Sequence, residues 1–388
     1  MPDRSLKTSR LCLTLLAALT VLLCCRWQRV FYLMCADYIL SDMPAHVRLA
    51  LGRNDYSLAS WIVRGLWGVL GEARGQTALS LVLTLNQLLG LGALSLLLRR
   101  CFPSVGISGA WGAALLAHVC GPWVFPGSME MYLGAYNGNV LHNMTMLFSR
   151  TPVPLVFLFF FRLWEDRRGT LRPRDWLGFS LCLLVSTLFK PSFLGAFAPV
   201  VLALLVWDFV RTRCRGFLNE LWIGLAVIPA ALALLWSSRV LFAEDFAGTS
   251  SGVALRALTP ALLASLLAAY LRGLLLPLWS GIVQGRAEAV RGRLRIVWGA
   301  LSVSIAEAAF LTETGFRAND GNFEWGALTL YTTVFGLAIA LLLRLLEKKD
   351  RAARRKSVPG LVLLLGHLAV GVYCLWRPGH AGYDWFYF

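Results

Sequence analysis

Residues 77–100 read TALSLVLTLNQLLGLGALSLLLRR, and this stretch contains the pattern that decides the fold. It runs for more than twenty residues without a charged side chain, and Arg99 and Arg100 follow directly. A helix of about 20 apolar residues is long enough to cross a lipid bilayer. Arginine at the end of such a helix favours the cytoplasmic side. The stretch therefore predicts a transmembrane helix whose last residues face the cytoplasm.

The same pattern repeats along the chain. About eleven apolar stretches alternate with polar loops, and every second loop is a run of basic residues, for example 165–174, 211–215 and 348–356. This alternation predicts an all-α, polytopic membrane helix bundle of about eleven transmembrane helices in the plasma membrane. The N-terminus is expected in the cytoplasm and the C-terminus on the extracytoplasmic side. Residues 1–388 are predicted to be a single integral membrane domain without a separate soluble domain.

Composition also indicates a membrane location. Of the 388 residues, 57% are hydrophobic and only 15% are charged, whereas soluble domains carry about 25% charged residues. A formal net charge of +16 would suggest nucleic acid as the partner of a soluble protein. Here most lysines and arginines lie in loops assigned to the cytoplasm, where they set topology and contact anionic lipid. We therefore expect membrane lipid, and no nucleic acid, as their partner.

Residues 35–75 form a long loop on the side away from the basic loops. Asp42 lies just beyond the first apolar stretch, and Pro44 and His46 follow it closely. Charged side chains are costly near lipid, so their presence favours a function. Asp42 can act as a general base or hold a divalent cation through oxygen, and His46 can bind phosphate or transfer a proton. The structural alternative is a helix cap for Asp42 and a surface imidazole for His46.

The second half of this loop predicts an amphipathic helix. Its apolar residues recur at helical spacing: Leu58, Trp61, Ile62, Leu66 and Val69. A cap signal precedes them at residues 54–55. We expect this helix to lie in the outer membrane interface, with tryptophan at the level of the headgroups. It either walls a cavity shared by lipid and water or covers the end of the bundle.

Two further polar groups lie in loops assigned to the outer side. The group after the ninth apolar stretch can point several side chains into one cavity: Glu313, Arg317, Asp320 and Asn322. The guanidinium of Arg317 can bind phosphate or carboxylate. The carboxylates of Glu313 and Asp320 can bind sugar hydroxyls or a cation. The group between the third and fourth stretches mixes aromatic, amide and ionisable side chains: Glu130, Tyr136, Asn137, His142 and Asn143. Carbohydrate sites use such mixtures, because rings stack on sugar faces and amides bind hydroxyls.

Lys190 is a lone cation before Pro191, at the outer end of two closely connected apolar stretches. The phosphate of a lipid is a natural partner for this amine. Each outer group also has an ordinary alternative. Residues 313–322 can be a solvated hairpin with an internal ion pair, the earlier loop can be a plain connection, and Lys190 can extend its amine to lipid headgroups.

Three motifs of soluble catalytic classes are absent. The chain has no Walker loop, no HExxH and no dinucleotide-binding fingerprint. The acidic residue of the early outer loop, the helix after it, the eleven or so spans and the outer clusters together resemble membrane glycosyltransferases of the type C fold. This resemblance implies transfer of a sugar from a polyprenyl-phosphate carrier to a glycan, lipid or protein acceptor at the extracytoplasmic face.

The resemblance also implies roles for individual residues. The catalytic acidic residue of the family's first outer loop corresponds to Asp42, and His46, Lys190 and Arg317 are candidates for binding phosphate. Many members carry two adjacent acidic residues, whereas here only Asp37 lies near Asp42, so a requirement for Mg²⁺ or Mn²⁺ stays open. A polytopic transporter, a lipid-carrier flippase and a polysaccharide polymerase are the alternatives. Transport needs a polar path through the bilayer, whereas the charged clusters gather at one face, which favours the enzyme.

Overall fold

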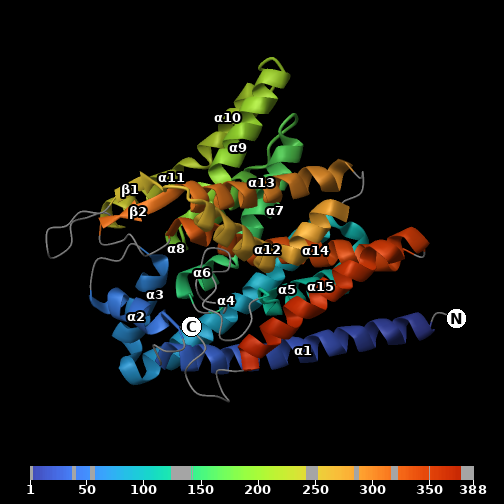
Figure 1. Cartoon of the computed structure of the whole chain (residues 1–388), viewed down its shortest axis with the longest axis horizontal. Helices are drawn as coiled ribbons and strands as arrows, with labels where there is room; N and C mark the ends of the chain where they lie inside the picture. Colours follow the sequence, from blue (N-terminus) through green and yellow to red (C-terminus); the bar gives the residue numbers. More distant parts are fainter. Residues whose placement is uncertain are drawn as a thin grey trace.

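The structure is a computed structural model, and it describes residues 3–36, 41–52, 57–123, 141, 143–241, 252–283, 288–315, 322–348 and 350–376. Nearly all of these residues are helical (Figure 1). The first helices are α1 (Asp3–Ala36), α2 (Met43–Gly52), α3 (Leu58–Leu70), α4 (Glu72–Cys101), η1 (Pro103–Val105), α5 (Gly106–Val119), α6 (Met144–Ser149), α7 (Pro152–Asp166) and α8 (Pro173–Phe189). The remaining elements are α9 (Ser192–Arg211), α10 (Phe217–Leu225), α11 (Ile228–Leu241), β1 (Gly252–Leu255), α12 (Pro260–Val283), α13 (Glu288–Phe310), β2 (Leu311–Thr314), η3 (Asn322–Glu324), α14 (Trp325–Glu347) and α15 (Arg351–Trp376).

Eight helical stretches in the described part of the chain are long and apolar enough to cross a membrane. They lie in α1, α4, α6 with α7, α9, α10 with α11, α12, α14 and α15. The coarse prediction of a helical, multi-pass membrane protein is thereby confirmed. Three helices that the prediction counts as transmembrane are not among the eight stretches, because α5 and α8 have only 14 and 17 residues and α13 carries several charged side chains.

Helix α14 occupies the centre of the bundle. Its side chains are buried without interruption from Gly326 to Leu342, and it packs against α4, α5, α9, α12, α13 and α15. Close packing requires small residues, since a Cβ atom added at Gly336 would lie 2.9 Å from the side chain of Leu94. In contrast, α1 exposes leucines along much of its length, as expected for a helix that faces lipid.

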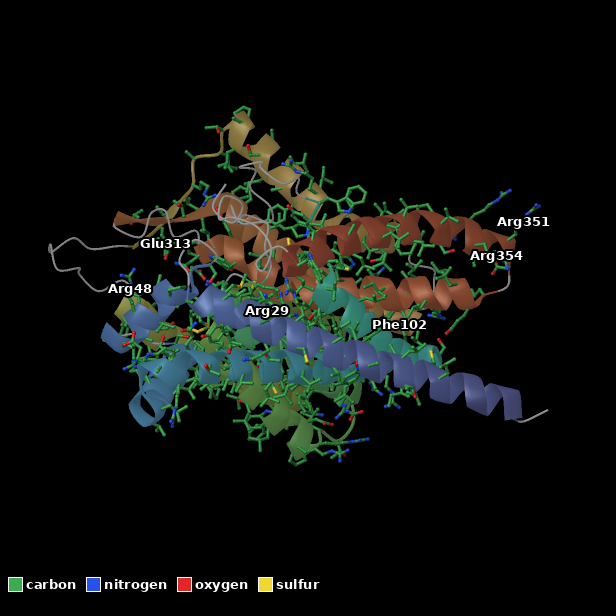
Figure 2. All side chains as sticks on the ribbon, turned by 90° about the horizontal axis from the view of Figure 1, so that it is seen from below. Arg29, Arg48, Phe102, Glu313, Arg351 and Arg354 are labelled. Carbon is green, nitrogen blue, oxygen red and sulfur yellow. The ribbon has the colours of Figure 1, made fainter. Side chains whose placement is uncertain are left out.

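The two ends of the bundle carry different segments of the chain. Figure 2 shows Arg48 of α2 and Glu313 of β2 at one end, and Arg351 and Arg354 of α15 at the other. Figure 1 places α2, α3 and the two strands at the same end. The first outer loop and the region of Glu313, which are far apart in the sequence, therefore lie at a common end of the molecule.

A small antiparallel sheet includes Glu313, in the region where the sequence predicts either a loop that faces a cavity or a solvated hairpin. Strand β2 pairs with β1, and Glu313 lies opposite Val253. A four-residue strand is too short to show a period of two, and its partner is distant in the sequence, so periodicity could not reveal it. The fourth apolar stretch is also broken, because Arg150 and Thr151 form a turn between α6 and α7.

Helix α3 forms where an amphipathic helix was predicted. Ser57 is its N-cap, while the predicted cap lies in residues 53–56, outside the described residues. Val63 is buried against the bundle, whereas Trp61 and Val69 are exposed. Apolar side chains of a membrane protein face lipid as well as the core, so spacing alone could not assign the two faces.

Candidate functional site

The turn between α1 and α2 fixes the position of Asp42. The hydroxyl of Ser41 donates a hydrogen bond to the carbonyl of Met34 at 3.2 Å, and it accepts one from the backbone N–H of Met43 at 2.9 Å. Ser41, Met43 and Pro44 are all buried. Because both flanks of the turn are anchored, Asp42 is held at a defined place beside the end of α1.

Asp42 and His46 meet across the first turn of α2. The carbonyl of Asp42 accepts the backbone N–H of His46 at 3.0 Å, which begins the helix. Residues four apart lie on the same helix face, and here Asp42 Oδ2 lies 3.3 Å from His46 Nε2. The exposed fractions of the Asp42 and His46 side chains are 31% and 23%, whereas one carboxylate oxygen of Asp42, Oδ1, is itself buried.

Asn143 joins this pair from a distant part of the chain. It is the N-cap of α6, where its Oδ1 accepts the N–H of Met146 at 3.0 Å and the hydroxyl of Thr145 at 2.8 Å. These contacts fix the orientation of the amide, so its Nδ2 donates to Asp42 Oδ2 at 2.8 Å and lies 3.1 Å from His46 Nε2. We call Asp42, His46 and Asn143 the Asp42 cluster.

The Asp42 cluster allows two positions for the imidazole proton. If the proton is on Nδ1 of His46, Nε2 can accept an N–H from Asn143. If Nε2 carries a proton, it can donate to Asp42 Oδ2. In both arrangements the carboxylate receives at least one hydrogen bond and stays partly exposed. A carboxylate held in this way has the chemistry that a general base needs.

The side chain of Asn143 has two roles, since it caps α6 and it donates a hydrogen bond to Asp42. Substitution of Asn143 can separate these roles. Asn143→Ala removes both functions, and loss of the cap alone costs about 1 kcal/mol. Asn143→Ser keeps a side-chain oxygen for the cap but removes the N–H groups that reach Asp42. We expect Asn143→Ala to lower the thermal unfolding midpoint of the purified protein and Asn143→Ser to restore most of it. Equal midpoints for all three proteins would contradict the assignment of this N-cap.

A second cluster joins residues around position 190 to those around 313 and 322. Buried Glu313 in β2 accepts a hydrogen bond from Asn322 Nδ2 at 2.8 Å. The backbone carbonyl of Asn322 accepts the hydroxyl of Ser192 at 3.1 Å. Lys190 is only 7% exposed, and its amine lies 4.5 Å from the centre of the Trp325 ring, within the range of a cation–π interaction. We call Lys190, Glu313, Asn322 and Trp325 the Lys190 cluster.

Helix α6 connects the two clusters. It begins after Asn143, and Phe148 near its end stacks on Phe189 with the ring centroids 5.0 Å apart. Phe189 is the last residue of α8 and directly precedes Lys190. The five residues from Asn143 to Phe148 correspond to a helical rise of about 8 Å. The Asp42 and Lys190 clusters are thus joined through one short helix at the same end of the bundle.

Two parts of this region were not identified from the sequence. Arg256 and Glu324 form a largely buried ion pair at 2.9 Å beside η3, and no local motif signals it because the partners are 68 positions apart. Asn143 was recognised only as part of an amide-rich loop. Its signal was an asparagine directly before an apolar run, which is typical of a helix N-cap.

Several predicted site residues lie outside the described residues: Glu130, Tyr136, Asn137, His142, Arg317 and Asp320. The structure therefore places Asp42, His46, Lys190, Glu313 and Asn322. Among the described residues, no group of three or more His, Cys, Asp or Glu side chains is arranged to hold a metal ion. Asp42 and His46 supply two such side chains, which lie 3.3 Å apart.

Comparison with known proteins does not assign this arrangement to a family. No family model, no curated protein and no solved structure matches the chain. The function therefore has to be inferred from the chemistry of the two clusters and from their place in the bundle.

Proposed function

We propose that this chain is an integral membrane glycosyltransferase. It transfers a sugar from a polyprenyl-phosphate carrier to a glycan, lipid or protein acceptor at the extracytoplasmic face. The observation that supports this most directly is the Asp42 cluster, in which residues from two distant segments hold one partly exposed carboxylate. Arg48 of α2, the helix that carries His46, lies at the end of the bundle opposite Arg351 and Arg354 (Figure 2).

The proposal includes eleven transmembrane helices with a cytoplasmic N-terminus. Helices α5, α8 and α13 add three spans to the eight stretches that are long and apolar enough. Helix α3 lies in the outer interface, which is consistent with the exposed Trp61 and Val69. Trp61 also contacts Trp236 of α11, with the ring centroids 5.9 Å apart. These rings lie at the level where tryptophan is enriched in membrane proteins.

The reaction assigns Asp42 the role of general base. Its carboxylate takes the proton of the acceptor hydroxyl while the hydroxyl oxygen forms a bond to the anomeric carbon of the sugar. The bond from that carbon to the carrier phosphate oxygen breaks, and its electron pair leaves with the lipid phosphate. His46 and Asn143 orient the carboxylate through the contacts at 3.3 and 2.8 Å.

The Lys190 cluster supplies the groups that act on the carrier and the sugar. The amine of Lys190 stabilises the negative charge that develops on the leaving phosphate. Glu313 and Asn322 are already hydrogen-bonded to each other, and together they offer acceptors and donors to sugar hydroxyls. Trp325 limits the positions open to the amine, because it holds the cation against its ring face.

The proposal can be tested with the purified full-length protein in liposomes that contain a polyprenyl-phosphate-linked sugar labelled in the sugar. We expect the label to move to an acceptor lipid or, without acceptor, to appear as free sugar, with release of polyprenyl phosphate. Empty liposomes provide the control. Movement of the intact labelled lipid to the other leaflet without cleavage would instead support the flippase alternative and contradict the enzyme.

A further inference from the structure

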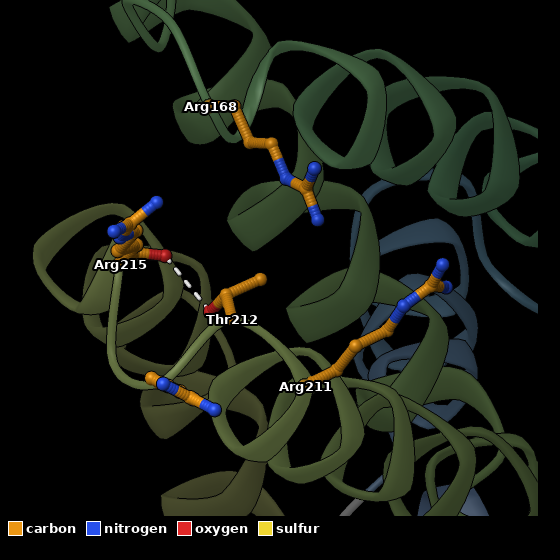
Figure 3. Close-up of a pocket in the computed structure, with 6 residues that line it drawn as sticks. Arg168, Arg211, Thr212 and Arg215 are labelled. Carbon is orange, nitrogen blue, oxygen red and sulfur yellow. Dashed lines mark hydrogen bonds between the residues drawn. The ribbon is translucent and has the colours of Figure 1, made fainter.

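A strongly basic pocket lies between the turn that joins α7 to α8 and the turn that joins α9 to α10. Its volume is about 570 Å³, and its lining residues are Arg168, Arg211, Thr212, Arg213, Arg215 and Gly216. Figure 3 shows Arg168 reaching from one turn and Arg211, Thr212 and Arg215 from the other around the same open space. None of the described residues that line the pocket is acidic. The glycosyltransferase proposal does not use this pocket.

The α9–α10 turn has an unusual backbone that gathers its arginines. Arg213 and Cys214 have φ angles of 53° and 66°, in the left-handed region that residues other than glycine rarely adopt. Several hydrogen bonds hold the turn in this shape. The N–H of Cys214 donates to the carbonyl of Phe209 at 3.0 Å, and the hydroxyl of Thr212 donates to the carbonyl of Arg215 at 3.0 Å. Three arginines within five residues are therefore carried by one ordered turn.

Two buried acids, Asp208 and Glu220, lie close to lining residues, and Asp208 is paired with Arg167 and with Arg168 of the lining. Asp208 accepts two hydrogen bonds from Arg167, at 2.8 and 3.1 Å, and one from Arg168 at 3.2 Å. Within the described part of the chain, no acidic side chain forms a salt bridge with Arg211, Arg213 or Arg215. The pocket therefore keeps an excess of positive charge that an anion from outside the chain can balance.

An apolar surface of membrane type reaches this pocket on α9 and α10. Trp207, Val210, Leu218 and Trp222 are all exposed beside the basic turn. Tryptophan is enriched where the hydrocarbon region meets the headgroups. The pocket consequently lies at the boundary where an apolar belt gives way to arginine, which is the level of a lipid phosphate.

We propose that this pocket binds the phosphate-bearing headgroup of an acidic phospholipid. The planar forks of several guanidinium groups match phosphate oxygens and bind them with charge-assisted hydrogen bonds. The volume exceeds that needed for one water molecule or ion and is in the range of small-molecule sites. The apolar belt on α9 and α10 gives the acyl chains of the same lipid a surface to lie on. This site is independent of the proposed transfer reaction.

The test compares two triple variants with equal loss of charge. The pocket variant is Arg211→Gln, Arg213→Asn and Arg215→Gln, with asparagine at 213 because it tolerates the left-handed conformation. The control variant replaces three arginines at the start of α15 with glutamine: Arg351, Arg354 and Arg355. Each full-length protein is titrated with phosphatidylglycerol or phosphatidylcholine in detergent, and bound lipid is counted by native mass spectrometry. Thermal unfolding midpoints report whether each variant is folded.

We expect the unmodified protein to have one saturable binding site for phosphatidylglycerol. Phosphatidylcholine should not replace the bound phosphatidylglycerol. An arginine near a membrane phosphate contributes about fivefold in affinity, so the pocket variant should lose about 100-fold. The control variant should change by less than about threefold, since its arginines lie outside the pocket. If the pocket variant does not fold, Arg211→Gln alone should lose about fivefold.

Two results would overturn the proposal. Equal losses of phosphatidylglycerol affinity in both triple variants would mean that the lipid binds through the overall positive charge of the protein and not through this pocket. The second result would come from a parallel titration with inorganic pyrophosphate. It would be that pyrophosphate binding is weakened by the pocket variant as much as lipid binding is, and that pyrophosphate displaces the lipid at equal concentration. That result would assign the pocket to a soluble phosphate and not to a lipid headgroup.

Discussion

Asp42→Asn is expected to lower the rate of sugar transfer by about 10²–10⁴-fold, the usual contribution of a general base. Asparagine has nearly the shape of aspartate and keeps an oxygen that can accept the 2.8 Å hydrogen bond from Asn143. Its amide oxygen cannot take the proton of an acceptor hydroxyl, so the chemical step is lost while the turn is kept. The measurement is the initial rate in liposomes at saturating lipid-linked sugar, with the unfolding midpoint as the test of folding.

Two further variants make this result specific to the Asp42 carboxylate. Glu72→Gln removes an exposed carboxylate at the start of α4, and we expect its rate to stay within about twofold of the unmodified protein. Asp42→Glu keeps the charge but shifts it by one methylene, and misplacement of about 1 Å can cost about 10²-fold. Full activity of folded Asp42→Asn would remove Asp42 from the mechanism.

The parts of the site that the sequence could predict are those set by local geometry. Asp42 and His46 are four residues apart, so any helix that starts between them brings the two side chains to one face. Asn143 could not be assigned to the same cluster, because its contacts join positions 97 and 101 apart. The burial of Glu313 was also hidden, since it depends on the pairing of β2 with β1.

The same division applies to the fold. The stretch 77–98 lies within α4, and its end at Arg99 and Arg100 matches the end of that helix at Cys101. Composition alone could not tell that α14 lies at the centre and α1 at the edge, because both are apolar. A membrane removes the usual contrast between a polar surface and an apolar core. The neighbours of each helix depend on shape, such as the fit of Leu94 against Gly336.

Lys190→Met is expected to lower kcat by about 10²–10³-fold, the effect of removing one group that stabilises developing negative charge. Methionine is similar in length and apolar, so it can fill the buried position beside Trp325 without the ammonium. If Lys190 acts mainly on the leaving phosphate, kcat and kcat/KM should fall together. Lys190→Arg retains the positive charge and should recover part of the rate.

The matched control is Lys348→Met, at the opposite end of α14 from Trp325, where the side chain is exposed. This variant loses the same charge from the same protein, so its kcat should remain within about twofold of the unmodified value. A rise in KM alone for Lys190→Met would mean that Lys190 binds substrate and transition state equally, which contradicts the stabilisation of the leaving group. Unchanged kcat and KM would separate the Lys190 cluster from the reaction and leave the Asp42 cluster as its only candidate site among the described residues.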